Sequence, residues 1–384
     1  MNYLHNATLY TPSEKIEHGT MIFDGEMIRA VGDAQGIGLP EGAKVIDGRE
    51  MHLVPGFIDL QVNGGFGMDF TGKPETIWQV GERLTQYGVT TFLPTIVSSA
   101  AKTIQSAQET ILNGPPAGYR GAHAVGLHLE GPYLNPNRTG AHDSAFLCLP
   151  DPQTYRQWTP ATGVCLVTLA PELPGAIEAI KRLVNNGVVV SAGHSAASFE
   201  QAREGIEAGI RYGTHLFNAM PPLDHREPGL AGAVLGDTRV TAGMIVDGIH
   251  VHPWMVNLAW KALGAERTNL VTDAMAALGM PPGRYELGSR SVIVDSSSAR
   301  LEDGRLAGSL LSLDQALRNL MRFTGASLQE TLPAVTQVPA YLLHQGALLG
   351  GLKSGARADF VLLTPDFQVE EVWIGGQKVL PGTD

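Results

Sequence analysis

The sequence predicts an α/β protein: a TIM-like (β/α)8 barrel with a small β-sandwich domain built from both chain termini. Three observations predict this fold. Short apolar runs alternate with helical patterns through the middle of the chain, and both ends contain strand-like runs without helices. Four residues able to bind a metal or move a proton follow apolar runs. The expected boundaries are residues 1–53 with 348–384 for the β-domain and 54–347 for the barrel.

Eight apolar runs are the expected barrel strands, and helical patterns such as Glu75–Tyr87 separate them. The runs are Val54–Val62, Thr90–Val97, Ala122–Glu130, Val164–Ala170, Val188–His194, Gly213–Asn218, Val240–Asp247 and Asn269–Asp273. Eight such units over about 250 residues match a (β/α)8 barrel. A doubly wound sheet is the alternative, but the Gly-rich nucleotide turn that usually follows its first strand is missing.

The segments outside these units are β-type. The stretch Met21–Gly32 has an Asp-Gly turn at its centre, and residues 358–364 and 371–379 repeat this style near the C-terminus. Residues 283–308 read as a β insertion, followed by a helix that starts near Ser312.

Composition narrows the function. The chain has 384 residues, of which 43% are hydrophobic, and a net charge of −11. An acidic chain without a basic stripe argues against nucleic acid as a partner. The two cysteines, Cys148 and Cys165, lack paired spacing, which favours a reducing compartment. Without an evident signal peptide or an apolar run long enough to span a membrane, a cytoplasmic protein is expected.

Four polar residues carry the chemical signal: Glu130, His194, His215 and Asp273. Each comes at the end of a predicted strand, and the C-terminal strand ends of a barrel face one cavity. Buried carboxylates are rare unless they are paired or bind a metal. We therefore expect a metal site with an acid/base beside it. His128 shares a strand face with Glu130 and is expected to be a supporting donor or a barrel filler.

Longer motifs resemble the amidohydrolase superfamily and, within it, the N-acetylglucosamine-6-phosphate deacetylase family, over essentially the whole chain. They are Pro55-Gly-Phe-Ile-Asp-Leu-Gln-Val-Asn-Gly, His128-Leu-Glu-Gly-Pro, Gly193-His-Ser, His215-Leu-Phe-Asn-Ala-Met, Arg226-Glu-Pro-Gly, Asp247-Gly-Ile-His and Val271-Thr-Asp-Ala. The resemblance implies metal-dependent hydrolysis of the N-acetyl group of N-acetylglucosamine 6-phosphate, giving glucosamine 6-phosphate and acetate.

One departure bears on the metal. Most members of the superfamily end the first strand in His-x-His, whereas this chain has Gln61 and Asn63, whose amides are poor ligands for a transition metal. We expect one divalent ion per subunit, held by Glu130, His194 and His215. Zinc suits this mixed N/O set, and iron, manganese or cobalt also fit.

The resemblance also implies catalytic roles. Asp273 would be the general base/acid, taking a proton from the metal-activated water and delivering it to the amine leaving group. His142 would stabilise the developing oxyanion near the substrate carbonyl. From the residues alone, His142 is equally well read as an ordinary polar loop residue.

Substrate contacts follow from the same resemblance. Arg226 and His250 would bind the phosphate, with His250 supplied by the neighbouring subunit of a homodimer. Sugar and acetyl contacts would come from residues on three loops: Ala141, His142, Asn218, Ala219, Leu306, Ala307 and Gly308.

Alternatives remain open. The sugar could be N-acetylgalactosamine 6-phosphate, which differs in the orientation of one hydroxyl. Another N-acyl substrate, such as an N-acyl amino acid or a cyclic amide, is disfavoured by the two phosphate-binding candidates. A catalytically dead scaffold of the same fold has no need of a buried carboxylate cluster.

Overall fold

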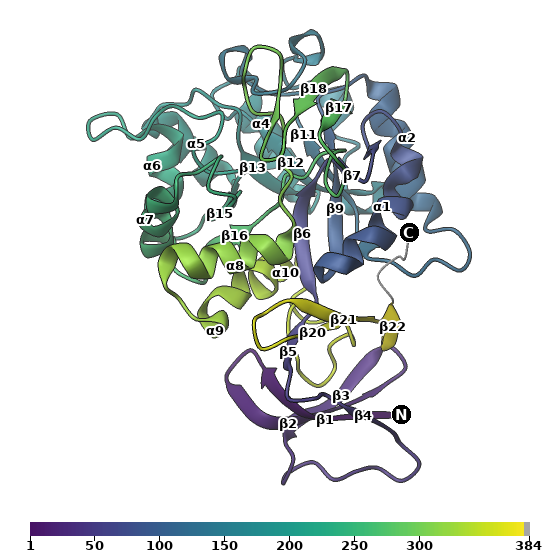
Figure 1. The fold of residues 1–384 in the computed structure, drawn as a ribbon. Helices are drawn as coiled ribbons and strands as arrows, with labels where there is room; N and C mark the ends of the chain where they lie inside the picture. The colour runs from purple at the N-terminus through teal and green to yellow at the C-terminus, as the bar shows by residue number, and fades with distance from the viewer. Residues whose placement is uncertain (380–384) are drawn as a thin grey trace.

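The structure, a computed structural model, describes residues 1–379 and consists of a barrel with a smaller β-domain beside it (Figure 1). The eight parallel barrel strands follow one another in chain order. They are β6 Phe57–Val62, β9 Val89–Val97, β11 Leu127–Glu130, β12 Val164–Leu169, β13 Val189–Ala192, β14 Tyr212–Gly213, β15 Thr241–Met244 and β16 Thr268–Leu270. The Asp273 amide donates to the Gln61 carbonyl (2.9 Å), which joins the last strand to the first. The predicted (β/α)8 barrel is confirmed.

Helices surround the barrel. The longer ones are α1 Ile77–Leu84, α2 Ala101–Asn113, α4 Ala176–Asn185, α5 Phe199–Ala208, α6 Gly229–Gly236, α7 Pro253–Leu263 and α8 Leu313–Thr324; the short ones are α3 Pro152–Tyr155, α9 Leu328–Thr331 and α10 Gln337–Leu342. A capping box between Ser198 and Gln201 fixes the start of α5. The predicted helix Glu75–Tyr87 is an α-helix flanked by two 3-10 turns.

The chain termini build one eight-stranded sheet. Its strands are β1 Asn2–Tyr10, β2 Lys15–Asp24, β3 Met27–Asp33, β4 Lys44–Asp47, β5 His52–Pro55, β20 Phe360–Leu363, β21 Val369–Ile374 and β22 Gln377–Val379. Antiparallel pairing of β5 with β20 joins the two halves. The rings of Phe23, Phe360 and Trp373 pack with centroids 5.3–5.6 Å apart in a core of their own. The exact domain boundaries stay a prediction, and residues 380–384 lie outside the described part.

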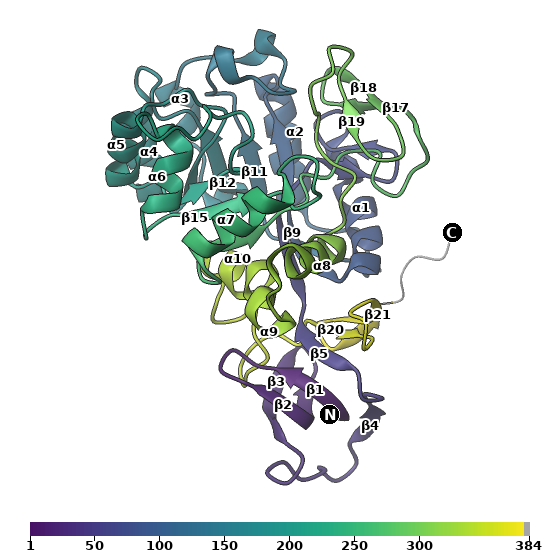
Figure 2. The ribbon, with the colours of Figure 1, turned by 60° about the vertical axis from the view of Figure 1, so that its left-hand side comes forward.

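The predicted insertion contains β17 Gly283–Leu287, β18 Arg290–Val294 and β19 Ala299–Arg300. It stands at the barrel end opposite the terminal β-domain (Figure 2). The short hairpin β7 Gly64–Gly65 with β8 Met68–Asp69 follows the first barrel strand, and β10 His123–Ala124 pairs with β9. As expected, the helix after the insertion begins at Leu313, with Ser312 as its N-cap residue.

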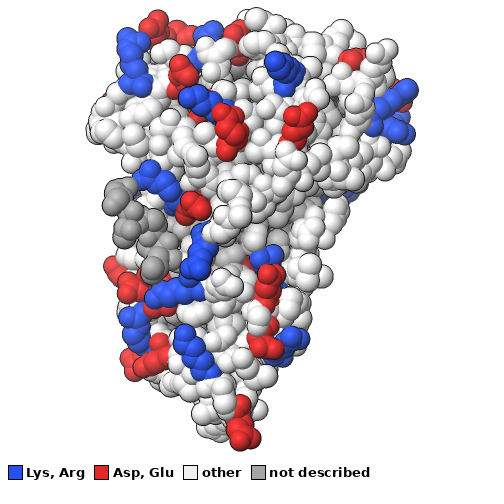
Figure 3. Space-filling view, turned by 90° about the vertical axis from the view of Figure 1, so that its right-hand side faces the viewer, with Lys and Arg blue, Asp and Glu red and all other residues white. Residues whose placement is uncertain are grey.

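The face in Figure 3 carries Lys and Arg interspersed with Asp and Glu, without a continuous basic stripe. Among the described residues, no helix is long and apolar enough to cross a membrane.

Candidate active site

The four predicted residues meet at one mouth of the barrel. Glu130 is the last residue of β11, while His194, His215 and Asp273 lie just beyond β13, β14 and β16. The last three have positive φ angles of 48°, 30° and 50°. Left-handed backbone is unfavourable for residues other than Gly, and where it occurs it is often found at functional sites. It also explains why β14 ends at Gly213, well before the predicted Asn218: the chain turns at His215.

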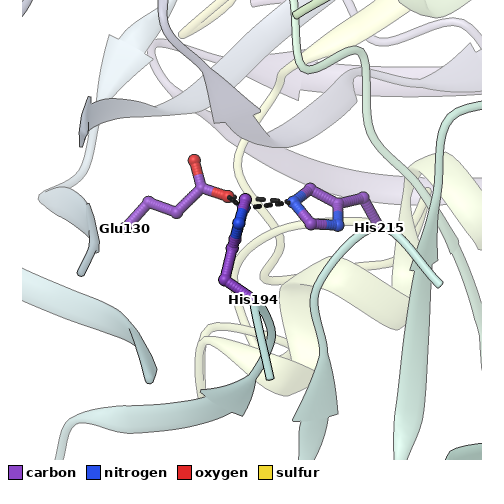
Figure 4. Close-up of side chains that lie close together, drawn as sticks. All are labelled: Glu130, His194 and His215. Carbon is purple, nitrogen blue, oxygen red and sulfur yellow. Dashed lines mark hydrogen bonds and ion pairs between the residues drawn. The ribbon is translucent and has the colours of Figure 1, made fainter. Parts of the chain in front are cut away.

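Glu130, His194 and His215 form a tight cluster of potential metal ligands (Figure 4). The Glu130 Oε1 atom lies 3.1 Å from His194 Nε2 and 3.0 Å from His215 Nε2, and the two nitrogens are 3.0 Å apart. All three side chains are buried. Ligand atoms about 2.0–2.2 Å from one zinc ion lie roughly this far from each other, so the spacing fits a single ion.

The hydrogen-bonding state of the cluster also calls for a cation. His194 Nδ1 is 2.9 Å from the Arg138 carbonyl oxygen, which can only accept, so Nδ1 carries the proton and Nε2 offers a lone pair. Outer-sphere bonds of this kind orient metal-binding histidines. His215 Nδ1 is buried and finds no partner among the described residues. Three electron-pair donors this close repel one another unless a proton or a metal lies between them.

The charges in the cluster support each other. Burial alone would raise the pKa of the Glu130 carboxyl, but the imidazoles of His142, His194 and His215 that lie against it hold this pKa well below its usual range. Burial alone would lower the pKa of His215, whereas its hydrogen bond to Glu130 raises it. Glu130 is therefore the anionic centre to which the neighbouring imidazoles are bound.

Asp273 lies beside the cluster with a different environment. Its Oδ1 accepts hydrogen bonds from Asn63 Nδ2 (2.7 Å) and Gln61 Nε2 (3.0 Å), and Gln61 Nε2 also reaches Glu130 Oε1 (3.2 Å). Burial and the charge of Glu130 raise the pKa of Asp273 to about 6. Such a carboxyl is ionised at neutral pH yet exchanges a proton readily, as a general base/acid requires. Gln61 and Asn63 therefore hold Asp273 in place.

His142 lies on the other side of Glu130. The Ser98 amide donates to its Nδ1 (3.2 Å), so this nitrogen is the acceptor and the proton of the neutral ring sits on Nε2. His142 Nε2 lies 3.6 Å from Glu130 Oε2, on the cluster side of the ring. Burial and the neighbouring His194 lower the pKa of His142. A neutral N–H donor therefore faces the site.

His128 is not part of this constellation. It is fully buried in the barrel, with Nε2 2.7 Å from Thr168 Oγ1 and Nδ1 3.3 Å from Thr95 Oγ1. Burial lowers its pKa to about 4, so it is a neutral barrel filler.

A cavity of about 390 Å³ opens above the cluster. Its lining includes most of the predicted contacts: Ala141, His142, Asn218, Ala219, His250, Leu306 and Gly308. Ala307, between the last two, is fully buried. His250 lies in the wall of its own chain's cavity, with Nδ1 2.6 Å from Asp247 Oδ2.

The arginines that line the cavity are not the one expected from the sequence. Arg226 is exposed and outside the cavity lining; its backbone amide donates to Asp224 Oδ1 (2.8 Å). Arg138 and Arg305 do line the cavity, and neither was predicted. Arg305 directly precedes the Leu306-Ala-Gly turn, so its position in the sequence could have pointed to it.

Comparisons of the sequence and of the fold with known proteins point to the same family. Residues 52–379 match the model of the amidohydrolase family. The N-acetylglucosamine-6-phosphate deacetylase of Rattus norvegicus is 38% identical over 85% of this chain and 83% of its own length. The N-acetylgalactosamine-6-phosphate deacetylase of Escherichia coli O157:H7 is also 38% identical, over 85% and 87%.

A solved structure extends the likeness to three dimensions. It is a mutant N-acetyl-D-glucosamine-6-phosphate deacetylase from Mycobacterium smegmatis, in complex with N-acetyl-D-glucosamine-6-phosphate. The fold agrees with a TM-score of 0.90 at 35% identity, covering 99% of both chains.

Proposed function

Since the chain belongs to the amidohydrolase family, we propose that it hydrolyses the N-acetyl group of N-acetylglucosamine 6-phosphate to give glucosamine 6-phosphate and acetate. The observation that carries the proposal is the Glu130–His194–His215 cluster beside Asp273 in one cavity. The names of the relatives, the Rattus norvegicus enzyme among them, support the substrate.

The cofactor is one divalent ion per subunit, most simply zinc, held by Glu130, His194 and His215. Bound there, such an ion supplies a nucleophile at neutral pH and polarises the amide carbonyl. Gln61 and Asn63 favour a single ion, because their amide groups already donate to Asp273 and are poor ligands for a transition metal.

Asp273 moves the proton. Its carboxylate takes a proton from the attacking water and returns it to the nitrogen of the leaving amine, which could not depart as an amide anion. Asn63 and Gln61 orient Oδ1, so the other oxygen is the one left for proton transfer. His142 offers its Nε2–H to the oxygen of the carbonyl as negative charge develops there.

Substrate binding uses the remaining wall of the cavity. Ala141, Asn218, Ala219, Leu306 and Gly308 line it. Together with Ala307 of the same turn they contact the sugar and acetyl group, while Arg226 and His250 bind the phosphate. Arg is well suited to phosphate because its planar guanidinium donates two parallel hydrogen bonds.

The protein forms a homodimer through the α7 face and contributes His250 to the neighbouring site. The support is a set of exposed apolar side chains on α7 and just before it: Trp254 is 75% exposed, Leu258 51% and Ile249 40%. Ile249 directly precedes His250, so a partner covering this patch would bring the two cavities near each other. The free cysteines Cys148 and Cys165 support a reducing compartment such as the cytoplasm.

Two named relatives differ in the sugar, so the epimer is the second candidate: the Escherichia coli O157:H7 enzyme is named for N-acetylgalactosamine 6-phosphate. The deciding experiment measures acetate release from both phosphorylated epimers and from unphosphorylated N-acetylglucosamine. The proposal expects the highest kcat/KM with N-acetylglucosamine 6-phosphate. Preference for the galacto epimer would reassign the sugar. Absence of release from all three, with zinc bound, would move the search to other N-acyl substrates.

A further inference from the structure

The insertion holds the loop that follows Glu130. Arg305, at the end of the insertion, donates from Nη1 to the Gly140 carbonyl (2.6 Å) and to Thr139 Oγ1 (3.1 Å). Its other nitrogens, Nε and Nη2, donate to Asp303 Oδ2 at 2.8 Å and 2.6 Å. Asp303 therefore fixes the guanidinium plane, while Nη1 holds the loop by hydrogen bonds to Thr139 and Gly140.

The loop segment that Arg305 holds also contacts the metal cluster. The Arg138 carbonyl accepts from His194 Nδ1, and Gly140 lies so close that a Cβ there would stand 2.9 Å from His194 Cε1. Gly140 also has φ +55°, where a side chain is strained. Two residues further on, His142 reaches Glu130. Any movement of residues 139–140 therefore changes the support of His194 and the position of His142.

A second contact holds the same loop to the insertion. Ser289 Oγ, in the β17–β18 turn, donates to Asp143 Oδ2 (2.8 Å). The turn itself is anchored to the β7–β8 hairpin, because the Gly288 amide donates to Asp69 Oδ2 (3.2 Å). The insertion is thus a fixed support at two points along one loop.

We propose that Arg305 is a positioning residue: by holding Thr139 and Gly140 it keeps the Arg138 carbonyl on His194 and His142 beside Glu130. This inference rests on the proposed metal site and adds a residue that acts through others. Supporting partners of metal-binding histidines are typically worth 10–100-fold in metal affinity. Since Arg305 acts one contact further away, we expect the lower end of that range.

The test measures Zn²⁺ affinity without sugar, by competition with a chromophoric chelator, in the full-length protein. Arg305→Ala removes both loop contacts, and Arg305→Lys keeps the charge but loses the fixed plane. Arg284→Ala is the matched control, because Arg284 also pairs with a carboxylate of the insertion, Glu302 (3.4 Å), and within residues 1–379 it has no hydrogen bond or ion pair with the loop. Ser289→Ala weakens the second contact and serves if Arg305→Ala fails to fold.

We expect about tenfold weaker Zn²⁺ binding in Arg305→Ala, a smaller loss in Arg305→Lys, and none in Arg284→Ala. With zinc saturating, kcat should fall while KM stays near the wild-type value, and the visible spectrum of the Co²⁺-loaded variant should shift. Unchanged Zn²⁺ affinity in a folded Arg305→Ala variant would overturn the proposal, and so would unchanged affinity in Ser289→Ala where Arg305→Ala does not fold. A rise in KM alone would also overturn it, because it would make Arg305 a substrate contact. A wild-type protein that binds Zn²⁺ but releases no acetate would instead refute the proposed function.

Discussion

Replacing Asp273 by Asn is the sharpest test of the proposed chemistry. The amide has nearly the shape of the carboxylate, and its oxygen can still accept from Asn63 Nδ2 and Gln61 Nε2, now at 2.7 Å and 3.0 Å. The metal cluster is formed by other residues, so metal content and substrate affinity should be preserved. What disappears is the group that accepts and returns the proton.

The expected loss can be estimated from its two roles. General acid–base catalysis contributes about 10²–10⁴-fold for one proton transfer, and Asp273 serves both the attack and the departure of the amine. We therefore expect kcat to fall by at least about 10³-fold, equivalent to about 4 kcal/mol of transition-state stabilisation. KM should change little, because Asp273 contributes no binding energy that is specific to the sugar.

The assay is acetate release under saturating substrate, with metal content and substrate binding measured on the same sample. A variant that retains zinc and binds substrate, yet turns over within tenfold of wild type, would refute the role of Asp273. The pH profile gives an independent check. The active form is the ionised carboxylate and its pKa is raised to about 6, so kcat/KM should rise with pH along an acid limb near pH 6. A bound cation moves that limb lower, and Asp273→Asn should abolish it.

Three further outcomes are expected. Arg226→Ala should raise KM for the phosphorylated sugar at least tenfold and leave KM for the unphosphorylated sugar unchanged. If steady-state assays give the variant and the wild type the same KM for the phosphorylated sugar, Arg226 is not part of the phosphate site. Burial raises the pKa of Asp59 to about 7, so its contribution to stability is present at low pH and is lost as the pH rises through 7; Asp59→Asn should flatten the dependence of the free energy of unfolding on pH between 4 and 7, measured by urea denaturation. Trp254→Glu should convert the proposed dimer to monomers in sedimentation velocity, whereas a wild-type monomer would contradict the α7 interface.

Much of the architecture follows from local sequence. Alternating apolar runs and helical patterns predict β/α units, and the Ser-x-x-Gln capping box before Phe199 places the start of α5. Once the strands are parallel and closed into a barrel, residues at their C-terminal ends must share one cavity. This is why Glu130, His194, His215 and Asp273 could be predicted to meet.

The sequence by itself therefore determined the fold class, the residues at the strand ends and the type of chemistry they support. The tertiary structure decided which loop residues join them: it leaves Arg226 exposed and brings Arg305 to the cavity wall. It also decided that the chain turns at His215 through left-handed backbone, which ended β14 earlier than predicted. The physical reason is the range of the interactions. Periodicity and caps act over a few residues, whereas the course of a loop depends on contacts such as Arg305 with Gly140, between residues far apart in the chain.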